Sequence, residues 1–128
     1  RIVELAHGKR LAFDEKWRTT RFNDILLEYI SNDRTQAPGW AVKPLLVDYI
    51  AYAIGPLGIC YLLPLEPLQY AWRSHGQAWI AAYGTKTAHN ATYRTLNCAV
   101  PAQELYRAMG TMLRQHFPPI YAPQGNTP

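Results

Sequence analysis

The chain has 128 residues, of which 48% are hydrophobic and 17% charged, and its formal net charge is +4. This length is typical of one domain, and the hydrophobic fraction is sufficient for a core, which excludes a chain that is disordered throughout. The small excess of basic residues is compatible with a polyanionic partner, but charge alone does not select one.

The first third of the chain predicts three strands. Ile2–Ala6 and the alternating run Lys9–Trp17 flank the turn signal His7-Gly8, so we expect a hairpin. After a polar, turn-like segment, Asp24–Ser31 is apolar on both faces except at Glu28. That pattern is typical of a central strand.

The rest of the chain mixes strands and helices. Strands are predicted over Leu45–Ile54, Gly58–Leu63 and Thr92–Val100, helices over Pro64–His75 and Pro101–Arg114, and loops over Asn32–Trp40 and Gly84–Ala91. Gln77–Tyr83 fits either helix or turn. The order predicts an α/β fold of the α+β kind, with a mixed central sheet flanked by helices, in a single domain over residues 1–115. Residues 116–128 hold four prolines and predict an extended tail.

The two cysteines, Cys60 and Cys98, have no closely spaced Cys or His partner. We therefore expect neither a disulfide framework nor a zinc site, and we interpret both cysteines as buried free thiols in a reducing compartment. No signal peptide and no apolar run of membrane-spanning length is visible in the sequence, so we expect an intracellular protein without a membrane partner.

Asp14, Lys16 and Glu28 are charged residues inside apolar strands, where an unpaired charge costs free energy. Asp14 and Lys16 are two residues apart and share one face of their strand. If the turn before the third strand is centred near Arg21, Asp14 faces Glu28 across the ladder on that side. Two facing carboxylates repel each other, and Mg²⁺, which prefers oxygen ligands, removes the repulsion. A phosphodiesterase site is therefore one interpretation, with the lysine stabilising charge on the phosphate.

Each of these residues also has a structural interpretation. Asp14 and Lys16 on a solvated strand face would make a contact that contributes little to stability. Glu28 can be a buried carboxylate that pairs with Arg18 or Lys16. Asp48, in an apolar run, is assigned to the capping of a strand or helix rather than to a metal.

Several short motifs follow one another in a defined order. They are Asp14-Glu15-Lys16, Asn23–Glu28, Ser31-Asn32, Pro38-Gly39-Trp40, Lys43, Val47–Tyr52, Tyr61–Pro64 and Val100–Leu105. In this order they resemble the PD-(D/E)XK nuclease superfamily, most of all its small uncharacterised members from phages and mobile elements. The Asp-x-Lys motif alone is unspecific, and the ordered set, from about Arg1 to Leu105, carries the resemblance.

The resemblance implies a restriction-endonuclease-like core and an endonuclease that hydrolyses DNA phosphodiester bonds with Mg²⁺ or Mn²⁺. Asp14 resembles the second metal-binding acid, Lys16 the catalytic lysine, and Glu28 an additional carboxylate near the metal or on the water path. Glu15 would point away from the site and pair with a nearby basic side chain. DNA is the implied partner, with no small-molecule cofactor. A homodimer would allow cleavage of both DNA strands. The implied location is the cytoplasm, which would be that of the host cell if a phage encodes the protein.

The pattern departs from that superfamily at its start. An earlier aspartate is expected on the strand before Asp-x-Lys, and a helix before that strand, but Ile2–Ala6 offers only Glu4. Two alternatives stay open: the acid lies upstream of Arg1, or the site is degenerate. The second predicts a catalytically inactive nucleic-acid-binding or assembly module that retains the nuclease fold. A structural domain without a nucleic-acid ligand is the third hypothesis.

Basic and aromatic residues near the motif are candidate contacts for nucleic acid. Arg18, Arg21 and Lys43 can hold phosphates, as can Arg34, for which solvated loop charge is favoured. Trp40 can stack on a base, although a tryptophan after Pro-Gly more often anchors packing.

Overall fold

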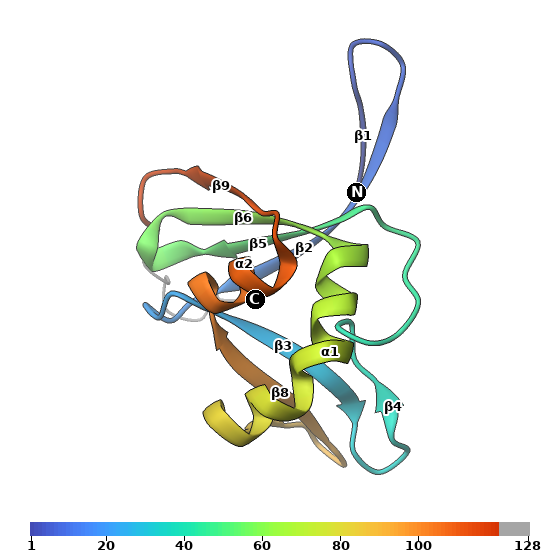
Figure 1. Ribbon diagram of the computed structural model, residues 1–128, viewed down its shortest axis with the longest axis vertical. Coiled ribbons are helices and arrows are strands. Elements are labelled where there is room, and N and C mark those ends of the chain that lie inside the picture. Colours follow the sequence, from blue (N-terminus) through green and yellow to red (C-terminus); the bar gives the residue numbers. More distant parts are fainter. Residues whose placement is uncertain (121–128) are drawn as a thin grey trace. The chain divides into compact units, whose positions relative to one another are not determined.

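The computed structural model describes residues 1–120, and these form two compact units that alternate along the chain (Figure 1). The first unit contains Arg1–Asn23, Leu46–Glu66 and the described part of the segment that begins at Thr111. The second contains Asp24–Leu45 and Pro67–Gly110. Strands and helices are both present, so the fold is α+β, as predicted. Most of the predicted C-terminal tail, residues 121–128, lies outside the described residues.

The first unit is built on a five-stranded mixed sheet in the order β1-β2-β5-β6-β9. Its strands are β1 (Ile2–Glu4), β2 (Arg10–Arg18), β5 (Tyr49–Ile54), β6 (Ile59–Pro64) and β9 (Leu113–His116). Residues 10–12 of β2 pair antiparallel with β1, whereas residues 13–18 pair in parallel with β5. The predicted hairpin over residues 2–17 is therefore confirmed, and Figure 1 shows β2 continuing from it into the sheet. A short 3-10 helix, η1 (Gly55–Leu57), connects β5 to β6.

The second unit is built on a four-stranded antiparallel sheet in the order β4-β3-β8-β7. Its strands are β3 (Asp24–Asn32), β4 (Ala37–Pro38), β7 (Lys86–His89) and β8 (Arg94–Pro101). β3 lies between β4 and β8, which confirms the central position predicted from its two apolar faces. Side chains of β3, β8 and both helices are fully buried in this unit: Ile25, Leu27, Cys98, Val100, Leu68 and Leu105.

Two α-helices lie in the described residues, α1 (Leu65–Tyr83) and α2 (Ala102–Met109). The predicted helix over residues 64–75 is confirmed and continues to Tyr83. The ring of Tyr29 in β3 stacks on Trp72 of α1 with centroids 5.3 Å apart, and Trp72 in turn contacts Trp79 at 6.2 Å. Within residues 1–120, none of the helices combines the length and apolar character that crossing a membrane requires.

Strand pairing differs from the prediction at one decisive point. The predicted ladder between residues 11–17 and 24–31 is wrong, because β2 pairs with β1 and β5 whereas β3 pairs with β4 and β8. The intervening segment Arg18–Asn23 has none of the Asn-Gly or Gly-X pairs that favour a tight hairpin. The strands that we expected in one central sheet therefore divide between two sheets.

Other corrections are local. The helix predicted to reach Arg114 ends at Met109, because Gly110 adopts a left-handed conformation (φ 75°) whose N–H donates to the Tyr106 carbonyl. The chain then forms β9 instead of a last helical turn. The predicted loop over residues 84–91 contains β7, and the strand predicted from Leu45 begins at Tyr49.

Candidate functional site

Asp14 and Lys16 form an ion pair on one face of β2, with Lys16 Nζ 3.1 Å from Asp14 Oδ2. Both side chains are about one-third exposed. In the parallel ladder, Asp14 lies beside Ile50 and Lys16 beside Tyr52, and both of these β5 residues are buried. Because laterally paired residues point to the same side of a sheet, this charged pair borders an apolar face. A charged pair here is partly screened by solvent and partly desolvated.

The opposite face of β2 carries Glu15, as expected for the residue between Asp14 and Lys16. Its carboxylate lies 2.6 Å from Nε of Arg1. The prediction that Glu15 points away from the pair and contacts a basic side chain is confirmed. Glu15 therefore provides a natural comparison for Asp14 on the same strand.

Glu28 lies in β3, in the second unit, directly opposite Asn97 of β8. The proposed register in which it faces Asp14 is wrong, since the two strands share no ladder. Gly39 approaches Glu28 so closely that a Cβ at residue 39 would lie 2.6 Å from Glu28 Cγ. The backbone N–H of Ala41 donates to the Glu28 carbonyl at 3.0 Å. Glu28 is thus held in a half-buried position by the segment after β4.

Asn97 and Lys86 extend this position into a polar row across the second sheet, because Glu28 pairs with Asn97 and Asn97 with Lys86. Asn97 is a buried polar residue, 7% exposed, and its side-chain amide donates to the Lys86 carbonyl at 3.4 Å. A carboxylate, an amide and an ammonium group therefore occupy neighbouring positions on three strands.

Carboxylate ligands for Mg²⁺ are available but sparse in this structure. Among residues 1–120, no three His, Cys, Asp or Glu side chains are grouped closely enough to hold a metal ion. Mg²⁺ usually uses only one or two protein carboxylates and completes its shell with water and phosphate oxygens, so Asp14 has suitable chemistry. Asp48 is engaged elsewhere, since its carboxylate accepts a hydrogen bond from the Ala12 N–H within β2.

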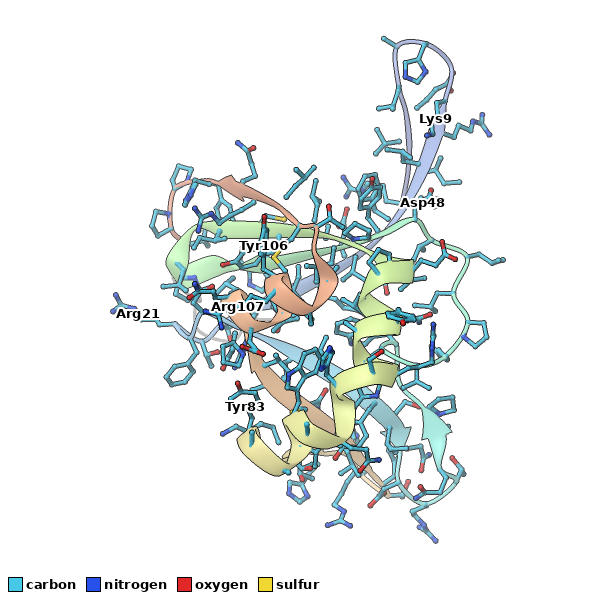
Figure 2. All side chains as sticks on the ribbon, viewed as in Figure 1. Lys9, Arg21, Asp48, Tyr83, Tyr106 and Arg107 are labelled. Atoms are coloured by element: carbon cyan, nitrogen blue, oxygen red, sulfur yellow. The ribbon has the colours of Figure 1, made fainter. Side chains whose placement is uncertain are left out.

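The predicted nucleic-acid contacts are distributed over both units. Arg18 shares the face of Asp14 and Lys16 on β2, and Arg21 follows in the segment after β2, where Figure 2 shows its side chain extending away from the ribbon. Lys43 is exposed, and its carbonyl accepts a hydrogen bond from Gln69 at 2.9 Å.

Trp40 is only 6% exposed, and its carbonyl accepts a hydrogen bond from the Gln69 side chain at 3.1 Å. A ring so little exposed has almost no face to offer a base. Its burial fits the packing anchor that the Pro-Gly-Trp sequence suggested as the alternative to stacking.

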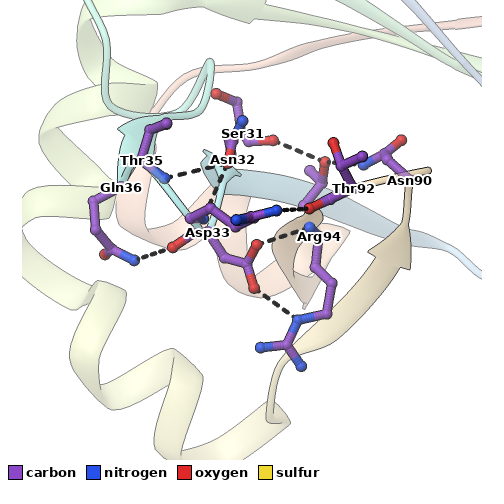
Figure 3. A network of polar contacts seen from close by, with 10 residues as sticks. Ser31, Asn32, Asp33, Thr35, Gln36, Asn90, Thr92 and Arg94 are labelled. Carbon is purple, nitrogen blue, oxygen red and sulfur yellow. Dashed lines mark hydrogen bonds and ion pairs between the residues drawn. The ribbon is translucent and has the colours of Figure 1, made fainter.

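A second polar cluster, of which sequence reasoning singled out only Arg34, joins the turn after β3 to the start of β8 (Figure 3). The Asp33 carboxylate accepts hydrogen bonds from the backbone N–H of Arg94 at 2.8 Å and from its Nε at 2.7 Å. These two donors hold the pKa of Asp33 below its ordinary value. Arg34 donates to the Thr92 carbonyl at 3.2 Å. In the sequence this cluster is visible only as two polar segments, residues 32–36 and 90–94, each with an arginine. Nothing in either segment shows that they lie side by side, because their proximity depends on the pairing of β3 with β8.

Comparisons of the chain with models of protein families, with curated proteins and with solved structures found no match.

Proposed function

We propose that the chain is a metal-dependent endonuclease domain that hydrolyses DNA phosphodiester bonds, with a restriction-endonuclease-like core of the PD-(D/E)XK type. The observation that carries the proposal is the Asp14–Lys16 pair, held 3.1 Å apart on one face of β2 beside buried side chains of β5. An acid and a lysine two residues apart on a strand are the residue types and the spacing that this chemistry needs.

Asp14 supplies a carboxylate that can hold Mg²⁺ or Mn²⁺, and the bound metal would polarise a phosphate oxygen and lower the pKa of a water ligand. Lys16 supplies a compact positive charge with three rotatable donors. At its position beside Asp14, the ammonium group can orient a water molecule or stabilise negative charge that develops on the phosphate. Partial burial strengthens both interactions relative to a fully solvated pair.

Glu28, which the resemblance implies as an additional carboxylate, lies in the second unit opposite Asn97, and the ladder that would bring it to Asp14 is wrong, so it is not assigned to the metal site. Arg18, Arg21 and Lys43 are proposed to contact DNA phosphates, with Trp40 as a less accessible candidate. The proposal includes an intracellular setting and pairing of two copies to cut both strands.

Cleavage of supercoiled plasmid DNA with Mg²⁺ or Mn²⁺ tests the proposal. The protein is assayed with any residues that the gene encodes upstream of Arg1, beside Asp14→Asn and Lys16→Ala variants. We expect each substitution to lower the nicking rate by about 100-fold or more, the usual effect of removing a group that stabilises charge in the transition state. Glu15→Gln is the matched control for Asp14→Asn, because it removes one carboxylate from the opposite face of the same strand.

Two outcomes would overturn the enzymatic proposal. One is the absence of metal-dependent nicking by the parent protein. The other is equal nicking by the parent, Asp14→Asn and Lys16→Ala, which indicates a contaminating nuclease. DNA binding without cleavage, with an affinity that falls steeply as salt rises, would instead support an inactive nucleic-acid-binding module.

A further inference from the structure

A shallow pocket of about 340 Å³ opens in the second unit, whereas the Asp14–Lys16 pair belongs to the first. Asp33 and Arg34 line it from the turn after β3, and residues 90–94 line it from the connection between β7 and β8. Pockets that hold small ligands measure roughly 300–1,000 Å³, so this one suits a phosphate with an attached sugar rather than a large molecule.

The pocket presents positive charge to solvent. Two guanidinium groups and one carboxylate belong to it. Asp33 is the less accessible member of the ion pair: its side chain is 15% exposed, whereas that of Arg94 is 57% exposed. Arg34 donates to a neutral carbonyl, that of Thr92, so this contact leaves its charge uncompensated. A diffusing anion therefore meets the guanidinium groups before it meets Asp33.

Arg94 is oriented with most of its donors available. A guanidinium has five N–H donors, and Asp33 engages the one on Nε. In Figure 3 the dashed line from the Asp33 carboxylate to the Arg94 side chain ends at Nε and not at a terminal nitrogen. The edge that carries the terminal nitrogens is the part of arginine that binds a phosphate through two parallel hydrogen bonds.

The turns that carry these groups are fixed before any ligand arrives. Asp33 and Arg94 exchange backbone and side-chain hydrogen bonds, including Asp33 N–H to the Arg94 carbonyl at 2.9 Å. Asn32 Oδ1 accepts from the N–H groups of Arg34 and Thr35 at 3.0 and 3.3 Å. Gln36 closes the turn by donating to the Asp33 carbonyl at 2.6 Å. Binding here would cost little ordering entropy, which favours affinity.

We propose that this pocket is a phosphate-binding site, in which Arg94 and Arg34 bind the phosphate group of a nucleotide, free or within a nucleic-acid strand. Asp33 is a positioning residue that holds the Arg94 guanidinium, and it does not contact the ligand. Tyr93, 36% exposed at the rim, offers a ring to the sugar or base. The site does not depend on nuclease activity, because it shares no residue with the Asp14–Lys16 pair.

Backbone amide spectra of the isotope-labelled protein test this proposal directly. The protein is titrated with inorganic phosphate, with a mononucleotide and with a short oligothymidylate, each against sodium chloride at equal ionic strength. We expect shift changes centred on residues 33–34 and 90–94. Arg34→Gln should weaken binding about tenfold or more, the effect of losing one charge-assisted hydrogen bond. This variant should fold, because within residues 1–120 the hydrogen bond that the Arg34 side chain loses is one to an exposed carbonyl, that of Thr92.

Arg73→Gln is the matched control, since it removes the same charge from α1 of the same unit, where Arg73 lies over the ring of Tyr70. Tighter binding of the oligothymidylate than of the mononucleotide would identify a strand as the source of the phosphate, and the reverse would identify a free nucleotide. Shift changes scattered over the surface would overturn the proposal. So would equal losses in Arg34→Gln and Arg73→Gln, or acetate binding as tightly as phosphate.

Discussion

The Asp48 carboxylate accepts a hydrogen bond from the backbone N–H of Ala12 at 2.7 Å, and the backbone N–H of Asp48 donates to the Ala12 carbonyl at 2.8 Å. The exchange occurs one residue before Phe13, where β2 leaves its ladder with β1 and joins β5. Asp48 thus joins the start of one strand to the middle of another, and it stabilises the strand that carries Asp14 and Lys16.

Replacing Asp48 should measure that stabilisation. We expect Asp48→Ala to lower the free energy of unfolding by about 1 kcal/mol, the usual net value of one hydrogen bond. Asp48→Asn keeps an oxygen acceptor and should lose less. Urea unfolding followed by tryptophan fluorescence gives both values. Equal stability of Asp48→Ala and the parent protein would show that water replaces the carboxylate without cost.

Gly39 should not tolerate a side chain. A Cβ at this position would meet both the Cγ of Glu28, at 2.6 Å, and the Glu28 carbonyl. We expect Gly39→Ala to lower the free energy of unfolding by about 1–3 kcal/mol, the range for overpacking. Adding Glu28→Ala removes the Cγ contact but leaves the carbonyl in place, so the double variant should recover little. Full recovery would show that the side chain, and not the backbone, sets the limit.

The Asp33–Arg94 contact should make stability depend on pH in the acid range. Hydrogen bonds from the Arg94 backbone and side chain hold the pKa of Asp33 below its ordinary value of 3.8. A carboxyl group with a lowered pKa in the folded state contributes stability above its unfolded pKa and loses it as the pH falls through the folded value. We expect the stability difference between the parent and Asp33→Asn to shrink as the pH drops below about 4. Urea midpoints measured across that range would contradict this if the two curves stayed parallel.

The two thiols should react slowly and in a fixed order. Burial raises the pKa of both Cys98 and Cys60, and the nearby charge of Glu15 adds to the rise at Cys60. Cys98 is fully buried, whereas Cys60 is half-buried. Because the thiolate is the reactive form, iodoacetamide should label Cys60 before Cys98 in the native protein.

Glu15→Gln should accelerate the labelling of Cys60, with Glu4→Gln in β1 as the control. Peptide mass spectrometry gives the rates. Faster labelling of Cys98 than of Cys60 would contradict the burial order, and an unchanged rate in Glu15→Gln would exclude the charge effect.

The sequence predicted those strands whose signal lies within the strand itself or in the turn beside it. The turn at His7-Gly8 and the alternation around it predicted the β1–β2 hairpin, and the apolar faces of Asp24–Ser31 predicted a central strand. Strand partners were not predictable in this way, because the side chains of one strand do not specify which distant strand lies beside it. The Asp14–Glu28 ladder failed for that reason.

Two short strands were missed because they carry little signal. All four residues of β7 are exposed, so its sequence shows no alternation of apolar and polar residues. β9 was missed because Met112 continues the helical spacing of Leu105 and Met109, so the helix was predicted to run on to Arg114. Gly110 is the signal that ends it. In the candidate site, the shared face of Asp14 and Lys16 followed from the two-residue period, whereas the Asp33–Arg94 pair required the β3–β8 pairing.

The chain passes between its two units four times, after Asn23, Leu45, Glu66 and Gly110. No single cut releases either unit as a continuous fragment, so truncation is a poor way to study one without the other. The order also matters during translation. β6 has its second neighbour only once Leu113–His116 leaves the ribosome, and until then the nascent chain carries an unpaired apolar edge at Ile59–Leu62. A chaperone that binds extended apolar segments could bind the nascent chain at Ile59–Leu62.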